Sequence, residues 1–302
     1  MTAYAGKASD VSDEKNGEAA KPMTPTTKPR DTTGPFEHSP DYVQSLARGL
    51  SVVRAFDRDH ARLTLSEVAE RTGLTRAVAR RNLLTLKHLG YVAAQGRDFY
   101  LRPRVLELGY SYLSSLDLGE IAQPVMEELS HRVGETCSLA VLDAGDIIYV
   151  ARVPVRRVMS IALGVGARLP AFVTSMGRVL LSSLEDDELT DWLASNKLRA
   201  ITAHTISKPT AWREEVARVR RDGYAIVSQE LELGLCSIAV PVRGNSGRLI
   251  AGLNVGLAYR DGVREYAVRK ILPALARTRD TIERALVRSG WMPTADGRRA
   301  RD

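Results

Sequence analysis

Apolar side chains recur at helical spacing where the first folded segment of the chain begins. Leu46, Leu50 and Val53 lie three and four residues apart, so they form one stripe along a helix. This stripe predicts an amphipathic helix over residues 43–57. Residues 1–40, by contrast, are rich in proline and have almost no aliphatic side chains beyond alanine. Too little apolar surface is present there to offset the entropy of ordering, and we expect a disordered tail.

Two threonines mark the starts of two further helices. Thr64 precedes an apolar stripe and has Glu67 three residues later, which is the spacing of a capping box. Thr75 precedes a second stripe of the same kind. Gly73 and Gly90 follow the ends of the two stripes, where glycine commonly ends a helix. The pattern therefore predicts two capped helices separated by a tight turn.

The segment after the third helix consists of two short runs rich in tyrosine, valine and phenylalanine. It reads YVAAQGRDFYLR, with Gly96 near its middle, and predicts two strands joined by a tight turn. Three helices followed by a hairpin make a winged helix-turn-helix. We assign this domain to residues 41–102.

The distribution of charge indicates what this domain binds. The chain has 43 Lys and Arg against 36 Asp and Glu, a net charge of +7, and residues 42–104 carry the whole excess. A capped helix with cations near its N-terminus can enter the major groove of DNA, where arginine reads guanine edges. Two alternatives stay open: a solvated helix face, and a domain that contacts only protein. The predicted DNA-binding residues are Thr64, Ser66, Thr75, Arg76, Arg80, Arg81, Lys87 and Arg97.

Residues 103–118 predict a linker helix that is apolar around most of its circumference. Leu106, Tyr110 and Leu113 form one stripe, and a second stripe lies beside it. Such a helix would expose apolar surface in a monomer, so we expect it to pack against a second copy of the chain. The alternative is burial within one chain.

Residues 119–290 predict a second domain of the α+β class. Strands lie between helices in the sequence, and their apolar runs favour a largely antiparallel sheet. The predicted helices cover residues 120–133, a short segment capped by Thr174 or Ser175, 185–194, 211–222 and 263–287. The predicted strands cover residues 136–153 with a turn at 143–146, 158–165, 224–231, 236–244 and 248–259. Residues 291–302 predict a second disordered tail.

Four segments of the chain together resemble the IclR family of transcriptional regulators. They read SLARGLSVVRAF, ARVP, GARLPAFVTSMGRVLL and GLCSIAVPVRGNSGRLIAGLNVG, and the resemblance extends from about residue 45 to about residue 286. The segment RVMSIALGVGARLPAFVTSMGRVLL is most similar to the branch that controls protocatechuate, 4-hydroxybenzoate and β-ketoadipate catabolism. The resemblance implies a winged helix, a linker helix and a GAF-like effector-binding domain. It further implies a homodimer or tetramer that binds double-stranded operator DNA and a small carboxylate, without a cofactor.

The resemblance also implies an effector pocket. One wall lies at the start of a helix, where free amides attract an anion, and another lies on the strands. Where some relatives have an acidic residue, this chain reads GYAIVSQE, which offers no carboxylate to a ligand hydroxyl at that position. Arg152 and Arg168 are candidate carboxylate clamps, unless each holds an acidic partner within the fold. The predicted effector-binding residues are Arg152, Met159, Arg168, Leu169, Ser175, Met176, Gly177, Ser228, Cys236, Ser237 and Asn254.

Other functional classes have little support in the residues. No GxSxG, P-loop or GxGxxG pattern occurs, so we do not expect an enzyme. The alternatives are a regulator of an unrelated small-carboxylate pathway and a hydrolase with a helix-turn-helix appendage. The five histidines and two cysteines show no metal-binding spacing, and Cys236 is expected to be a small buried side chain. Two cysteines and no run near ~18 apolar residues favour a cytoplasmic protein rather than a membrane protein.

Overall fold

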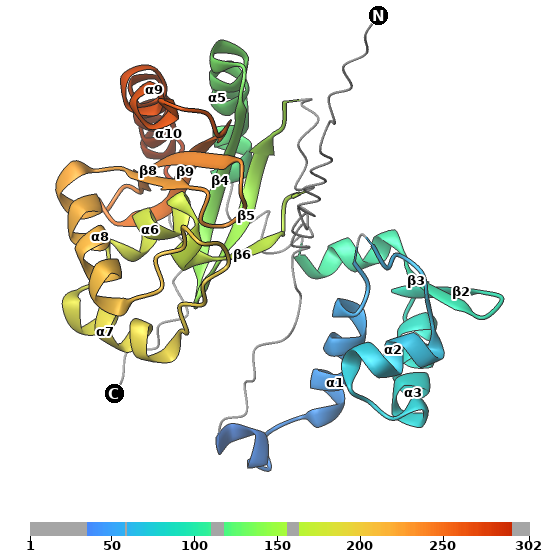
Figure 1. The fold of residues 1–302 in the computed structure, drawn as a ribbon. Helices are drawn as coiled ribbons and strands as arrows, with labels where there is room; N and C mark the ends of the chain where they lie inside the picture. The colour runs from blue at the N-terminus through green and yellow to red at the C-terminus, as the bar shows by residue number, and fades with distance from the viewer. Residues whose placement is uncertain (1–34, 58, 110–117, 156–162, 292–302) are drawn as a thin grey trace, which may run out of the picture.

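The structure, a computed structural model, describes residues 35–57, 59–109, 118–155 and 163–291. These residues form two domains, an N-terminal one of short helices with a hairpin and a C-terminal one built on a large sheet (Figure 1). Within the described ranges, no helix is long and apolar enough to cross a membrane.

The N-terminal domain is a winged helix-turn-helix, as the sequence predicts. Three helices pack around a small core that includes Val52, Val68 and Leu83. The hairpin forms a three-stranded sheet in the order β1-β3-β2, whose first strand the sequence analysis did not anticipate. The elements are α1 (Gln44–Arg54), β1 (Leu63–Thr64), α2 (Leu65–Thr72), α3 (Arg76–His88), β2 (Val92–Gln95) and β3 (Asp98–Leu101).

Local side chains determine where these helices begin and end. The Thr64 hydroxyl accepts a hydrogen bond from the Glu67 amide at 3.4 Å, and the Glu67 carboxylate accepts one from the Thr64 amide at 2.7 Å, so the predicted capping box is present. Gly73 ends α2 with a left-handed backbone, at φ 67°. Helix α1 ends three residues before the predicted boundary, and Asp57 accepts hydrogen bonds from two later amides in a tight turn.

Only the start of the predicted linker helix lies among the described residues. A 3-10 turn over Pro103–Leu106 continues as helix to residue 109. Residues 110–117 lie outside the described ranges, so the full extent of this helix stays a prediction.

The C-terminal domain has a six-stranded sheet in the order β6-β5-β4-β9-β8-β7, and every neighbouring pair is antiparallel. The strands are β4 (Thr136–Asp143), β5 (Asp146–Val153), β6 (Arg168–Pro170), β7 (Ala225–Ser228), β8 (Leu235–Arg243) and β9 (Leu249–Ala258). The helices are α5 (Leu118–Val133), α6 (Ser175–Leu181), α7 (Asp186–Ser195), α8 (Pro209–Asp222), α9 (Val263–Tyr266) and α10 (Leu272–Arg288). The α+β prediction is confirmed.

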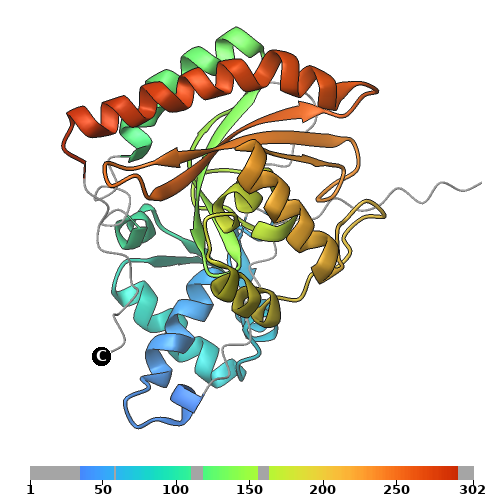
Figure 2. The same ribbon diagram turned by 90° about the vertical axis from the view of Figure 1, so that its left-hand side faces the viewer.

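Helices cover both faces of this sheet (Figure 2). Helices α5 and α10 pack on one face, where Cys137, Leu139 and Cys236 belong to the larger apolar core. Helix α6 lies on the other face, and its Met176 and Val179 share a second core with Ala140 of β4. Because side chains alternate along a strand, β4, β5, β7 and β8 contribute to both cores, whereas β6 contributes Leu169 to the second core alone.

The ends of the C-terminal domain differ from the predicted boundaries. Trp291, assigned to the second tail by the sequence analysis, is only 6% exposed and its carbonyl accepts a hydrogen bond from Asn245 at 2.8 Å. The C-terminal domain therefore includes Trp291.

A π-helical turn over Ala267–Ile271 interrupts the predicted final helix. Pro273 follows it and has no amide for an ordinary helical bond.

Two further segments differ from their predicted structure. Residues 156–162 of the predicted strand 158–165 lie outside the described ranges, and the described part, 163–165, is not a strand. The sheet is instead completed by β6. Residues 35–40 of the predicted N-terminal tail are described, and they include a 3-10 turn over Pro35–His38.

Candidate functional site

The N-terminal domain divides its cations into two groups. Some are held by the domain itself: Arg71 pairs with Asp57 at 2.6 Å, and Arg62 lies 4.9 Å from the centre of the Tyr100 ring. The others are exposed, and no described carboxylate pairs with them. This second group includes Arg76, Arg80, Arg81, Lys87 and Arg97, together with Arg54 and Arg102. All five cations that the sequence predicts to contact DNA belong to this second group.

Helix α3 carries four of these cations, Arg76, Arg80, Arg81 and Lys87, at exposed positions, and Arg97 lies in the turn between β2 and β3. Ala79 and Leu83 are fully buried, whereas Arg76 and Arg80 are exposed. The Thr75 hydroxyl accepts from the Val78 amide at 3.4 Å and so caps the helix at its cationic end. Ser66 is exposed on the first turn of α2, while the Thr64 hydroxyl is engaged in its cap. Contact of these residues with DNA stays a prediction.

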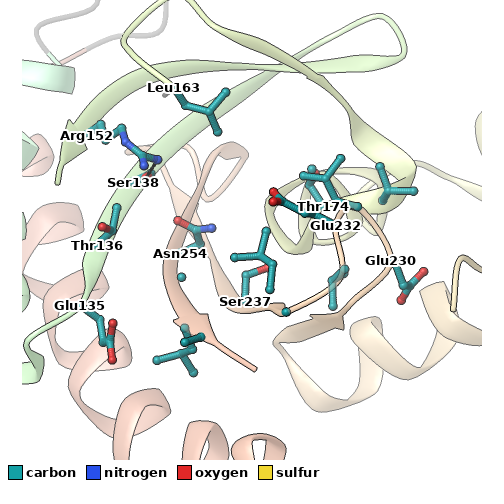
Figure 3. A pocket seen from close by; sticks show the side chains of 18 of the residues that line it. Glu135, Thr136, Ser138, Arg152, Leu163, Thr174, Glu230, Glu232, Ser237 and Asn254 are labelled. Atoms are coloured by element: carbon teal, nitrogen blue, oxygen red, sulfur yellow. Dashed lines mark hydrogen bonds between the residues drawn. The ribbon is translucent and has the colours of Figure 1, made fainter. Parts of the chain in front are cut away.

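The C-terminal domain contains a cavity of about 240 Å³ on the sheet face that carries α6. Strands β4, β5, β8 and β9 form its floor, and the loop between β7 and β8 forms one wall (Figure 3). Its apolar lining residues are Tyr149, Val155, Leu163, Val173, Val227, Leu231, Leu235, Leu257 and Ala258. Its polar and charged lining residues are Glu135, Thr136, Ser138, Arg152, Thr174, Glu230, Glu232, Ser237 and Asn254.

A polar row crosses the floor of the cavity. Arg152 lies opposite Ser138 on the neighbouring strand, and Ser138 lies opposite Asn254 on the next. The Arg152 guanidinium donates to the Ser138 hydroxyl at 3.3 Å and lies 5.9 Å from the centre of the Tyr149 ring. Burial lowers the pKa of Arg152 from its usual value. No carboxylate among the described residues pairs with this cation, so it remains available to a ligand.

Asn254 adds an unsatisfied acceptor to this row. Its side chain is 8% exposed, and its Oδ1 has no hydrogen-bond partner among the described residues. A buried polar atom without a partner is costly, so such an atom facing a cavity is typical of a binding site. Figure 3 shows this amide pointing into the cavity, near Ser138 and Arg152.

An acidic side chain lies on another part of the wall. Glu232 comes from the β7–β8 loop and lines the cavity, as Thr174 does (Figure 3). Burial raises the pKa of Glu232 above its usual value. Thr174 is less available, because its hydroxyl accepts from the Gly177 amide at 3.0 Å and donates to the Ala171 carbonyl at 3.2 Å.

A buried arginine anchors the loop that carries Glu232. Arg178 of α6 is 1% exposed, and its guanidinium reaches Glu230 at 2.5 Å and Glu215 at 3.0 Å. Burial raises the pKa of Glu215, but hydrogen bonds from Arg218 and the charge of Arg178 outweigh this and hold the pKa below its usual value. The network ties the cavity wall to α6 and α8.

The structure places three of the predicted effector residues on the cavity wall: Arg152, Ser237 and Asn254. Met159 lies outside the described residues. The other predicted residues lie elsewhere, and each has a physical reason for doing so.

Strand alternation accounts for two of the misplaced residues. Ser237 faces the cavity, so its neighbour Cys236 faces the opposite core against α10. Ser228 pairs with Cys236 across the strands and shares its face. Burial raises the pKa of the Cys236 thiol.

The start of α6 is packed rather than open. Ser175, Met176 and Gly177 are buried and do not line the cavity, and the Gly177 amide is engaged by Thr174. A Cβ on Gly177 would lie 2.0 Å from the Ala171 carbonyl oxygen, so glycine is needed there for packing. These three residues do not line the cavity, and the predicted anion site at this helix end stays a prediction.

Neither predicted residue of β6 reaches the cavity. Arg168 pairs with Asp143 at 2.6 Å and with Asp146 at 3.3 Å, at the turn between β4 and β5. It is therefore a surface ion pair rather than a clamp. Leu169 is 5% exposed and belongs to the core beneath the cavity wall.

The comparisons with known proteins agree with this architecture. The model of the IclR helix-turn-helix domain matches residues 45–96, and that of the C-terminal domain of bacterial IclR regulators matches residues 110–284. The chain is 40% identical to the Pca regulon regulatory protein of Pseudomonas putida, over 89% of this chain and 96% of that one. It is 39% identical to the p-hydroxybenzoate hydroxylase transcriptional activator of Acinetobacter baylyi, over 79% and 90%.

A solved structure extends the comparison to a ligand complex. An IclR homolog from Microbacterium hydrocarbonoxydans, complexed with 4-hydroxybenzoate, superimposes with a TM-score of 0.71. The two are 27% identical, and the alignment covers 81% of this chain and 99% of that one.

Proposed function

The chain belongs to the IclR family of bacterial transcriptional regulators, and we propose that a small aromatic carboxylate, bound in its C-terminal cavity, controls its affinity for operator DNA. The named relatives are regulators, and their names place them in protocatechuate and p-hydroxybenzoate metabolism. As a DNA-binding protein of bacteria it acts in the cytoplasm, without catalysing a reaction.

Arg152 is the observation that carries this proposal. It is a cation at the edge of a mostly apolar cavity, and no described carboxylate neutralises it. A ligand carboxylate would supply that partner, and it could also accept hydrogen bonds from the Ser138 hydroxyl and from the amide N–H of Asn254 on the neighbouring strands.

The size and lining of the cavity favour an aromatic acid. About 240 Å³ lies below the usual range for drug-sized ligands, which suits a single small ring. Tyr149, Leu163 and Leu257 provide apolar surface for the faces of such a ring. The 4-hydroxybenzoate complex of the Microbacterium homolog supports the same ligand class.

Control of DNA binding requires that the ligand favour one of two arrangements of the protein. We infer a homodimer, because large apolar side chains are exposed on α1 and at the start of the linker. Leu106 is 73% exposed and Leu46 is 61% exposed, which a second copy of the chain would cover. A palindromic operator with half-sites about 34 Å apart follows from a two-fold dimer.

Calorimetry on the full chain tests the ligand assignment. We expect 4-hydroxybenzoate or protocatechuate to bind the wild type, and Arg152→Ala to lose roughly 10- to 100-fold in affinity, since a charge-assisted hydrogen bond contributes about 1.5–3 kcal/mol. Arg168→Ala is the matched control, because this arginine is paired at the surface and should bind as the wild type does. Equal losses in the two variants, or equal affinity in all three proteins, would remove Arg152 as the clamp.

A further inference from the structure

The cavity carries an acid as well as a cation, and the two lie on different parts of its wall. Arg152 and Ser138 lie together on β5 and β4, and Glu232 comes from the β7–β8 loop on another part of the wall (Figure 3). We propose that Glu232 binds a hydroxyl group of the effector, so that the cavity selects a hydroxylated aromatic monocarboxylate over the unsubstituted acid and over a dicarboxylate. This inference rests on the proposed function and names the ligand chemistry more closely.

The carboxyl group of Glu232 is available to form a hydrogen bond with a ligand. Among the described residues, no donor or cation is bonded to its carboxyl group, although it lines the cavity and is half-buried. The raised pKa of Glu232 reflects burial alone, without an opposing cation. A hydroxyl group suits this position because it can donate to a carboxylate and accept from a neutral carboxyl group.

The loop that presents Glu232 is firmly held. Thr202 donates to the Gln229 carbonyl at 2.6 Å, and Thr205 donates to the Glu230 carbonyl at 2.8 Å. Gln229 has a left-handed backbone with φ 60°, a conformation that costs free energy outside glycine and persists because its surroundings fix it. Glu232 is therefore presented from a pre-organised loop rather than from a free one.

The same arrangement disfavours a ligand with two carboxylates. Arg152 is the only cationic side chain that lines the cavity among the described residues, and Glu230 is already neutralised by Arg178. A second carboxylate near Glu232 would bring two negative groups together without a cation between them. Burying such a group without a partner is costly, so the dicarboxylate should bind more weakly.

The test measures the affinities of three probes by calorimetry on the full chain: 4-hydroxybenzoate, benzoate and β-ketoadipate. We expect the wild type to bind 4-hydroxybenzoate at least tenfold more tightly than benzoate, because a site built for a hydroxyl rejects the analogue that lacks it. Glu232→Ala should reduce this ratio to about one and bring β-ketoadipate closer to benzoate.

Two further variants make the outcome specific. Glu232→Gln keeps a hydrogen-bonding group without the charge, so it should retain part of the hydroxyl preference while β-ketoadipate gains affinity. Glu214→Gln removes an exposed acid of α8 that does not line the cavity, and it should leave the ratio between 4-hydroxybenzoate and benzoate unchanged.

The measurements distinguish failure of the aromatic-effector proposal from failure of the role proposed for Glu232. If the wild type binds benzoate and 4-hydroxybenzoate equally, or if Glu232→Ala keeps the wild-type ratio, the role of Glu232 is overturned while the aromatic effector stands. If neither aromatic acid binds, or if β-ketoadipate binds most tightly, the aromatic effector is overturned and the role of Glu232 falls with it.

Discussion

The cations of the DNA-binding domain lie at its surface, whereas two arginines of the effector domain are withdrawn from water and serve different ends. Arg80 and Arg81 are exposed and unpaired among the described residues, so they suit a polyanion whose phosphates and base edges approach from solvent. Arg152 faces a small apolar cavity, and Arg178 is fully buried between two carboxylates. Arginine therefore serves three roles in this protein: DNA contact at the surface, ligand binding at the cavity and stabilisation of the fold in the interior. The surroundings of each arginine determine its role.

The largest effect is expected where an arginine is buried and paired. Arg178→Met leaves Glu230 buried without its cation and leaves Glu215 with Arg218 alone, so we expect a loss of about 3–5 kcal/mol in the free energy of unfolding. Urea unfolding followed by circular dichroism measures this. Arg168→Met breaks an exposed pair and should cost about 0–1 kcal/mol. Similar losses in both variants would show that burial does not set the importance of these arginines.

Filling the cavity should strongly weaken ligand binding by the C-terminal domain without changing DNA binding by the N-terminal domain. Ser237→Phe places a ring where the ligand sits, and we expect roughly a 100-fold loss in ligand affinity, about 2.7 kcal/mol, with operator affinity unchanged in the absence of ligand. Ser237→Ala is the control and should retain binding. An unaltered ligand response in Ser237→Phe would mean that the effector binds elsewhere.

Removing an exposed cation of α3 should weaken DNA binding alone. Arg80→Ala or Arg81→Ala should cost about 1–3 kcal/mol of discrimination between operator and random DNA if the contact is to a base. Fluorescence anisotropy at fixed salt measures both affinities. Lys270→Ala removes an equal charge from the exposed surface of the effector domain and should change neither value. If all three variants behave alike, α3 does not read the operator.

The smallest effect is expected at the cap of the same helix. Thr75→Ala removes the hydroxyl that accepts from the Val78 amide, and we expect a loss of about 1 kcal/mol in the free energy of unfolding. Thr75→Ser keeps the hydroxyl and should stay close to the wild type in thermal or urea unfolding. A larger loss in the serine variant than in the alanine variant would contradict the cap.

The DNA-binding domain could be predicted from sequence because its signals are local. Thr64, Thr75 and Gly73 act within one helical turn of their own positions, and the structure has the two caps and the left-handed turn. The end of α1 was predicted less well. The hydrogen bonds of Asp57 to later amides depend on the turn that follows, which hydrophobic periodicity does not report.

The effector cavity could be predicted only in part, because its residues meet through strand pairing. A β-bulge lies where Leu139 and Ala140 pair with β5, and Val150 and Ala151 both belong to the core on the α10 side. The bulge brings Arg152 onto the cavity face, which simple alternation from Tyr149 would not.

Alternation alone could have corrected one prediction. Cys236 and Ser237 are adjacent on one strand, so they cannot both face the same cavity. Glu232, by contrast, reaches the cavity from an irregular loop fixed by Arg178 and two distant threonines, and no periodic signal in the sequence indicates that position.

The central claim is that a carboxylate bound at Arg152 changes how the exposed cations meet DNA. The most direct test is anisotropy of labelled operator DNA at fixed salt, with and without 4-hydroxybenzoate, protocatechuate or β-ketoadipate, for the wild type, Arg152→Ala and Arg168→Ala. We expect a hydroxylated aromatic acid to shift the operator Kd by about fivefold or more in the wild type and Arg168→Ala, and not in Arg152→Ala. A shift of equal size in Arg152→Ala, or no shift with any aromatic acid in the wild type, would contradict it.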